Sequence, residues 1–153
     1  MATSSVSSAE VLSFEESELP ACLAATPQAH PTSERAKYGK QSLRWDWQSG
    51  SVLTFTHPID FKPYTPEAES NALSTFVVWI YNTTPSADVL RFEFGQASNR
   101  DCWFTFGLDF TGWRTCWVAF ERDMQGKPIA GMDTLRVIAP AEGHSGTVFL
   151  DSL

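Results

Sequence analysis

Short runs of alternating apolar and polar residues, separated by Pro, Gly, Ser, Asn and Asp, dominate this chain. Leu43, Trp45 and Trp47 fall on one face of an extended segment, because successive side chains of a β-strand point to opposite sides. A tight turn at Ser49-Gly50 follows, and the next alternating run predicts a strand that pairs back as a hairpin. The pattern therefore indicates β-structure, and no window shows a helical period.

Nine strands are predicted, at 11–15, 41–48, 52–56, 74–81, 90–94, 102–110, 113–120, 134–138 and 147–153. The segment 74–81 is apolar on both faces, which favours a central, sandwiched strand. Residues 16–38 and 57–73 are expected to be long connections. Many short strands with long crossovers predict an all-β fold, an antiparallel two-sheet sandwich of the jelly-roll type.

The length of 153 residues and mass of 17.0 kDa correspond to one domain, which we expect to occupy residues 11–153. The Ser-rich residues 1–10 are expected to be a disordered leader or an extension added to the natural chain. The last predicted strand runs to the final residue, which favours a fragment of a longer protein. Residues 1–10 contain neither the basic nor the apolar region of a signal peptide.

The net charge of −7 argues against a nucleic-acid partner or an anionic membrane, because such partners bind through Lys and Arg. No window approaches the length of a membrane span. Three cysteines lie far apart, at Cys22, Cys102 and Cys116. A disulfide between Cys102 and Cys116 on neighbouring strands is one alternative, and buried free thiols are the favoured one.

No catalytic motif is present: GxSxG, HExxH, GxxxxGK[ST] and GxGxxG are all absent, and no pair of carboxylates stands out. His30, His57 and His144 are isolated in predicted loops. The Asn82-Thr83-Thr84 sequon is interpreted as a turn. We therefore expect no catalytic residue in this chain.

The six tryptophans are candidates either for the core or for a sugar platform, because a planar ring can cover the apolar face of a pyranose. Core packing is favoured for Trp45 and Trp47, which share a face with Leu43, and for Trp79, which lies in the most apolar strand. Trp103 and Trp117 are the candidates for a sugar-binding groove. The guanidinium groups that would fork onto a sugar carboxylate or sulfate belong to Arg44, Arg91 and Arg114.

A possible metal site combines carboxylates from the first and last predicted strands, which run side by side in a jelly roll. Glu15 or Glu16 and Asp151 would supply carboxylates, and the loop Tyr38–Lys40 would supply carbonyl oxygens. Such an all-oxygen cage suits Ca²⁺, which takes 6–8 oxygen ligands. The alternative is that these acids are solvated charges at strand ends.

Several segments resemble the chondroitin sulfate ABC lyases. Residues 39–51 (GKQSLRWDWQSGS) are similar to the QSLxWxWxxGS segment of that family, 76–82 (FVVWIYN) to FxxWLYN, 108–114 (LDFTGWR) to LDFTGWR, and 132–136 and 149–151 to the closing VDSIRF and IYIDRI segments. These lyases belong to polysaccharide lyase family 8 and degrade glycosaminoglycans.

The resemblance implies an N-terminal jelly-roll domain that is similar to carbohydrate-binding modules and precedes a catalytic toroid domain. It implies a secreted or periplasmic parent enzyme, whose other domains and glycosaminoglycan substrate would be the partners of this chain. Many carbohydrate-binding modules hold a structural Ca²⁺ through a Glu near the first strand and an Asp in the last, which implies such roles for Glu15 or Glu16 and Asp151.

The hypothesis is a non-catalytic module that positions hyaluronan, chondroitin sulfate or dermatan sulfate and stabilises the enzyme, with a structural calcium ion. Two alternatives stay open. The domain would be purely structural, with no sugar affinity, or it would contribute residues to the lyase cleft.

Overall fold

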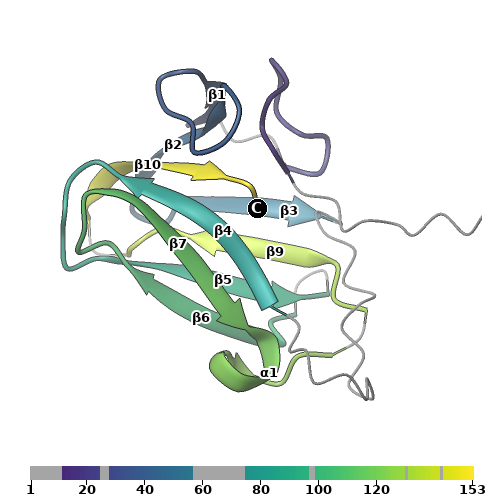
Figure 1. Ribbon diagram of the computed structural model, residues 1–153. Coiled ribbons are helices and arrows are strands. Elements are labelled where there is room, and N and C mark those ends of the chain that lie inside the picture. Colours follow the sequence, from purple (N-terminus) through teal and green to yellow (C-terminus); the bar gives the residue numbers. More distant parts are fainter. Residues whose placement is uncertain (1–11, 25–27, 57–74, 97–98, 130, 142) are drawn as a thin grey trace, which may run out of the picture.

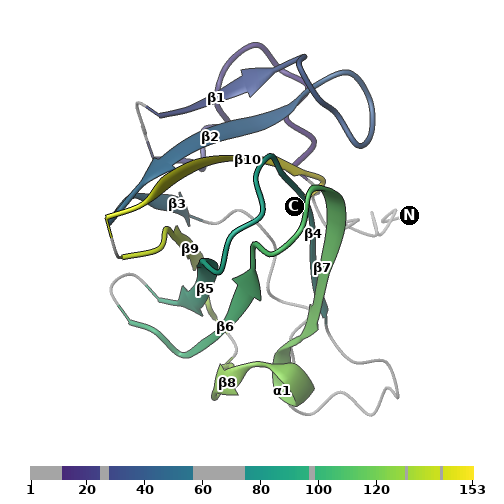
Figure 2. The same cartoon turned by 90° about the vertical axis from the view of Figure 1, so that its left-hand side faces the viewer.

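Two five-stranded antiparallel sheets pack face to face in the computed structural model (Figures 1 and 2). The structure describes residues 12–24, 28–56, 75–96, 99–129, 131–141 and 143–153. One sheet has the strand order β1-β2-β10-β4-β7 and the other has the order β3-β9-β5-β6-β8. The predicted all-β, two-sheet sandwich is confirmed.

The strands lie between the segments that are rich in turn-forming residues. The strands are β1 (Ala29–Thr32), β2 (Ser42–Gln48), β3 (Val52–Thr56), β4 (Thr75–Asn82), β5 (Val89–Gly95), β6 (Cys102–Gly107), β7 (Gly112–Ala119), β8 (Gln125–Gly126), β9 (Thr134–Ile138) and β10 (Ser145–Asp151), and a single turn of helix, α1, spans Phe120–Asp123. No helix within these described residues is long and apolar enough to cross a membrane.

The inner face of the first sheet follows directly from the alternation in β2. Trp45 and Leu43 are fully buried, and their register partners in β10 are Val148 and Leu150. Directly opposed residues of an antiparallel pair point to the same side, so these four side chains form one apolar layer. Trp47 continues that layer and is also buried, as predicted.

A cluster of phenylalanines joins the two sheets. Phe92 of β5 stacks on Phe104 of β6, with ring centroids 4.8 Å apart and planes within 3°. Phe76 of β4 crosses from the other sheet, and its centroid lies 5.0 Å from that of Phe94 and 5.8 Å from that of Phe92. Such aromatic pairs contribute beyond the area that they bury, so this cluster is the main contact between the layers.

The beginning of the chain differs from the prediction. Residues 12–15 form no strand: Leu12 exchanges two backbone hydrogen bonds with Leu153, at 2.9 and 3.2 Å, and then Phe14 takes a left-handed φ of 57°. That conformation ends the extension while the Phe14 ring is buried. The first strand is instead β1, inside the predicted connection 16–38. The leader 1–10 and the connection 57–73 lie outside the described residues.

The prediction that Trp79 belongs to the core is wrong. Val78 and Ile80 take the inner face of β4, so Trp79 lies on the outer face, where it is half-buried against Tyr38. Both faces of β4 read as apolar because a loop, not a second sheet, covers the outer one.

Cys102 and Cys116 are buried free thiols, which confirms the favoured alternative. They lie on β6 and β7, in different sheets. Burial away from water raises the pKa of each thiol to about 12, because desolvation penalises the thiolate. Neither thiol is therefore suited to nucleophilic chemistry at neutral pH.

We expect Phe92→Ala to lower the free energy of unfolding by about 3–5 kcal/mol, because it removes a ring from the centre of the aromatic cluster and leaves a cavity. Urea unfolding followed by tryptophan fluorescence measures the loss. Thr105→Ala, on the exposed side of β6, is the matched control and should change stability by less than about 0.5 kcal/mol. Equal effects of the two substitutions would contradict this account of the core.

Candidate functional site

The five predicted sugar-binding residues separate onto two sheets. Trp103 and Arg91 lie on the outer face of β3-β9-β5-β6-β8, whereas Arg44, Trp117 and Arg114 belong to the other sheet. Alternation along a strand predicts which face of the strand a side chain occupies. It does not predict which of the two sheets contains that strand. The set predicted from sequence therefore does not form one surface.

The surface around Trp103 is built by cross-strand register. Glu93 of β5 lies directly between Trp103 of β6 and Arg136 of β9. Arg91 stands two residues before Glu93 on the same face of β5, and Arg100 approaches from the loop before β6. We call these five residues the Trp103 face.

Cations surround the indole ring on this face. The Arg100 guanidinium carbon lies 4.0 Å from the Trp103 ring centroid, and that of Arg91 lies 5.9 Å away. Glu93 Oε2 lies 3.3 Å from Arg100 Nη1 and 3.4 Å from Arg91 Nε. The second contact lacks hydrogen-bond geometry, so the buried Arg91 Nε has no hydrogen-bond partner.

The charge balance of the Trp103 face is positive although the chain is acidic. Two guanidinium groups, from Arg91 and Arg100, contact the one carboxylate of this face, that of Glu93, whose side chain is only 13% exposed. Arg136 adds a third cation as the register partner of Glu93 on β9. A partly neutralised arginine cluster beside an aromatic ring matches an anionic sugar, which needs both an apolar platform and a cation.

Sequence analysis missed Arg100 and Arg136. Arg136 alternates with buried Leu135 and Val137, so its outward direction was readable, but its position opposite Glu93 depends on the pairing of β5 with β9. Arg100 precedes its strand, in a loop whose path no periodicity specifies.

The three remaining predicted residues have other surroundings. Trp117 is 71% exposed on β7. Arg114 lies 4.4 Å above the Phe110 ring and 3.6 Å from Asp109.

Arg44 is held by two carboxylates, with Nη1 2.8 Å from Glu34 Oε1 and Nη2 3.1 Å from Asp46 Oδ1. These hydrogen bonds raise the pKa of Arg44, with the bond to Asp46 the largest cause. Its charge is therefore already compensated.

A second group of cations and rings covers the outer face of β4. Arg35 lies 4.0 Å from the Tyr81 ring centroid, and Lys37 Nζ lies 4.3 Å from that of Trp79. Both cations come from the predicted connection 16–38, where no pattern identified them. They explain why Trp79 is half-buried while it stands outside the core.

The predicted metal residues do meet at one place. Asp151 Oδ2 accepts hydrogen bonds from the backbone N–H of Lys37 at 2.8 Å and of Tyr38 at 3.0 Å. The Glu15 carboxylate accepts from the backbone N–H of Lys40, at 3.0 and 3.1 Å, and of Gln41, at 3.3 Å. The first and last parts of the chain are therefore joined through the loop 37–41.

The loop differs from the prediction in the groups that it presents. Tyr38 and Lys40 direct N–H groups, not carbonyl oxygens, at the two carboxylates. Glu15 reaches the loop, whereas the neighbouring Glu16 is exposed. Gly39 permits the approach, because its φ is 67° and a Cβ there would collide with the Glu15 carboxylate.

Asp151 carries an unbalanced charge in this arrangement. It is fully buried, and its Oδ1 has no hydrogen-bond partner. Desolvation raises the pKa of Asp151, and the nearby charge of Glu15 adds to the rise. Among the described residues, no group of three or more His, Cys, Asp or Glu side chains is placed to hold a metal.

Comparison with solved structures defines the class of fold. The family 11 carbohydrate-binding module from Clostridium thermocellum, solved with a β-1,3-1,4-mixed-linked tetrasaccharide, superposes with a TM-score of 0.56 at 10% sequence identity, over 94% of this chain and 92% of that one. The chain is thus a β-sandwich of the carbohydrate-binding-module type. It belongs to the family described as "Lyase, N terminal", whose model matches residues 8–153.

Two relatives agree with that family. A chondroitin sulfate ABC exolyase of Bacteroides thetaiotaomicron is 38% identical over 149 residues, which are 97% of this chain, and one of Proteus vulgaris is 35% identical over 140 residues, or 90% of the chain. The chain spans 14% of the length of each. The resemblance found in the sequence is confirmed.

In the absence of metal, the Asp151 carboxyl should make unfolding pH-dependent. Its pKa is raised in the folded state, so its contribution to stability is fully present below the ordinary value of 3.8 and is lost as pH rises through the folded value. Asp151→Asn removes this titration while an amide oxygen can still accept from Lys37 and Tyr38.

We therefore expect the variant to gain stability relative to the wild-type chain as pH rises from about 4 to 7 in chelator. Thermal melts at each pH measure the difference. A constant difference between the two proteins across this range would contradict the assignment.

Proposed function

We propose that this chain is the non-catalytic N-terminal domain of a secreted or periplasmic glycosaminoglycan lyase, and that it holds the anionic polysaccharide on the Trp103 face. The observation that carries the proposal is the Trp103 ring with Arg91 and Arg100 beside it, and with Arg136 two strands away on the same face. Family membership and the exolyase names of the relatives support the parent activity.

In the proposed binding of the polysaccharide, the Trp103 ring and the arginine side chains contact different parts of the sugar chain. The indole covers the apolar face of one sugar ring, and the guanidinium groups bind the carboxylate or sulfate of the neighbouring units. Because the whole chain carries −7, attraction is local to this face and the rest of the surface repels the polymer. That balance favours modest affinity and positioning.

Catalysis is assigned to the rest of the parent enzyme. The histidines of the described residues, His30 and His144, stand on β1 and beside Asp88, far apart in the sequence and without a nucleophile. The domain then acts on rate only by holding substrate near the catalytic domain, and by stabilising the protein.

A structural role is the second candidate, because the other sheet exposes apolar side chains. Trp117 and Val77 are register partners on β7 and β4, and both are exposed. A packing surface for the remaining domains of the lyase would use such residues. In that case the domain has no sugar affinity of its own.

We also propose that a calcium ion binds at Asp151 and Glu15. The buried Asp151 Oδ1 without a partner and the neighbouring Glu15 carboxylate support this site, because a divalent cation would offset both charges. Carbonyl oxygens near Tyr38–Lys40 would complete the shell once the peptide units that direct N–H groups at the carboxylates turn over. The ion would clasp two chain segments that are distant in sequence.

Sugar binding is tested by calorimetric titration of the chain with chondroitin sulfate and hyaluronan oligosaccharides at low and high salt. We expect affinity to fall as salt rises, because screening weakens ion pairs. Trp103→Ala should weaken binding about tenfold, as for a central aromatic contact. Glu93→Gln should strengthen it, because two guanidinium groups lose their competing carboxylate.

The matched control is Trp117→Ala, an equally large loss on the opposite sheet, which should leave affinity unchanged. If Trp117→Ala removes binding and Trp103→Ala does not, the wrong face has been chosen. An affinity that is the same at low and high salt would exclude the arginine cluster as the binding site. The absence of any binding would favour the structural role.

Calcium is tested by thermal unfolding in chelator and after addition of Ca²⁺. A hundredfold excess over the dissociation constant should stabilise the folded state by about 2.7 kcal/mol. That gain corresponds to a rise in Tm of roughly 5–10 °C. Mg²⁺ should stabilise less, because it requires a tighter octahedral shell. Asp151→Asn should abolish the shift, and a full calcium shift in that variant would place the ion elsewhere.

A further inference from the structure

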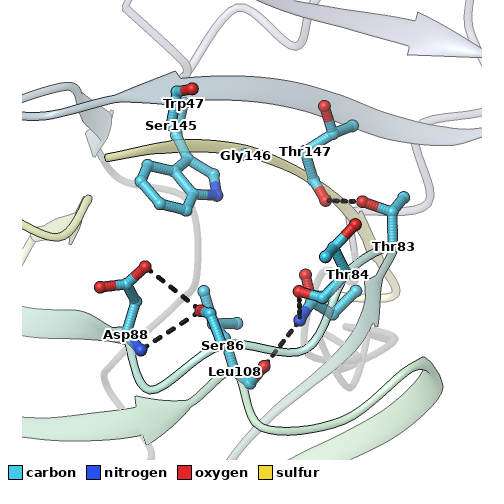
Figure 3. A pocket seen from close by; sticks show the side chains of 10 residues that line it. Trp47, Thr83, Thr84, Ser86, Asp88, Leu108, Ser145, Gly146 and Thr147 are labelled. Carbon is cyan, nitrogen blue, oxygen red and sulfur yellow. Dashed lines mark hydrogen bonds between the residues drawn. The ribbon is translucent and has the colours of Figure 1, made fainter. Parts of the chain in front are cut away.

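A cavity of about 190 Å³ lies at the end of the sandwich where β10 begins (Figure 3). Ser145, Gly146 and Thr147 line it, whereas Asp151 closes the other end of the same strand. At about 3.3 Å per residue, the cavity and the Asp151 carboxylate are separated by the length of the strand. Trp103 is likewise at the far end of β6, so this cavity is distinct from both sites described above.

The cavity is preformed by a buried amide. Asn82, at the end of β4, donates hydrogen bonds to the carbonyl oxygens of Thr84 at 3.0 Å, Leu108 at 2.8 Å and Phe110 at 3.0 Å. These bonds tie the connection after β4 to the connection after β6. The walls of the cavity are therefore held in place before any ligand enters.

One wall carries a hydrogen-bond donor without a partner. The Trp47 side chain is 3% exposed, and its indole Nε1 has no hydrogen-bond partner. Figure 3 shows this nitrogen on the side of the ring that faces the cavity. Gly146 makes room for the ring, because a Cβ there would lie 3.0 Å from Nε1 and 2.7 Å from a ring carbon. A buried donor left unpaired is costly, so a partner supplied by a ligand would be favourable.

The opposite wall carries an oriented carboxylate. Asp88 Oδ2 accepts a hydrogen bond from Ser86 Oγ at 3.2 Å, and Asp88 Oδ1 lies 2.9 Å from His144 Nδ1. An ionised carboxylate has about four acceptor positions, so capacity remains for hydroxyl groups from the cavity side. Thr83 and Thr84 add side-chain hydroxyls to the lining.

We infer that this cavity binds one uncharged sugar unit, such as an N-acetylhexosamine, between the Trp47 N–H and the Asp88 carboxylate. The N–H donates to an oxygen of the sugar, and the carboxylate accepts from two of its hydroxyls. A cavity of about 190 Å³ has room for one pyranose ring and not for two.

The charge of the lining selects against acidic sugars. Asp88 is the only charged residue among the ten described residues that line the cavity, and no Lys or Arg is among them. A uronate or a sulfated unit would meet the like charge of Asp88, and the lining offers it no Lys or Arg. The cavity thus differs in ligand class from the Trp103 face, where guanidinium groups favour an anion.

The test follows the tryptophan indole N–H signals of the ¹⁵N-labelled 153-residue chain by NMR during titration with N-acetylgalactosamine. We expect one indole signal, absent in Trp47→Phe, to shift with the sugar. Trp47→Phe keeps an aromatic ring at the buried position while it removes the N–H donor, which has no partner in the protein, and part of the indole volume. Urea unfolding of the variant checks that it still folds. Both Trp47→Phe and Asp88→Asn should weaken binding at least about fivefold, the usual effect of one lost hydrogen bond.

Glucuronate is the charged probe, and it should bind about tenfold more weakly than N-acetylgalactosamine in the wild-type chain. Asp88→Asn should narrow that gap, because it removes the like charge. Trp103→Ala is the matched control and should leave the titration unchanged, whether or not that variant still binds polysaccharide. No shift of the Trp47 signal, or equal affinities in the wild-type chain and Trp47→Phe, would overturn the inference.

Discussion

The structure depends on the insertion of the last strand, β10, between β2 and β4. This pairing completes the first sheet, sets Leu150 between Leu43 and Ile80, and sets Val148 opposite Trp45. The pairing of β2 with β10 joins segments that are about a hundred residues apart in the sequence. The burial of the apolar layer around β10 offsets the conformational entropy that is lost when this long loop closes. One end of β10 builds the wall of the Trp47 cavity, and the other brings Asp151 to the loop 37–41.

The polar groups at the two ends of β10 differ: a buried acceptor lies at one end and a buried donor at the other. At Asp151, a buried carboxylate is surrounded by backbone donors and a second acid, an arrangement that a cation would stabilise. At the cavity, a buried indole donor without a partner and a carboxylate line the same open space, an arrangement that suits a neutral polar ligand. The Trp103 face differs again, because cations outnumber acids there. The three proposed sites thus differ in the charge of the groups that they present.

The fold itself does not select among these ligands. The carbohydrate-binding module that superposes on this chain shares only 10% of its sequence, so the likeness concerns the backbone. What distinguishes this domain is the parity of a few strand residues: Trp103 and Arg136 emerge outward beside Glu93, and Trp47 emerges inward at the cavity. The class of ligand therefore depends on the side chains of each surface and on their charge.

The sequence by itself determined the strands from 41 onward except the two-residue strand β8, and it determined the buried positions of Trp45 and Trp47, the buried thiols and the family. Alternation specifies which side chains share a face, and it requires no knowledge of the partner strand. Only the tertiary structure decided that residues 12–15 turn away at Phe14 and that Trp79 packs under Lys37. It also placed Trp103 and Trp117 on opposite sheets, because strand pairing depends on contacts that are distant in sequence and leave no periodic signal.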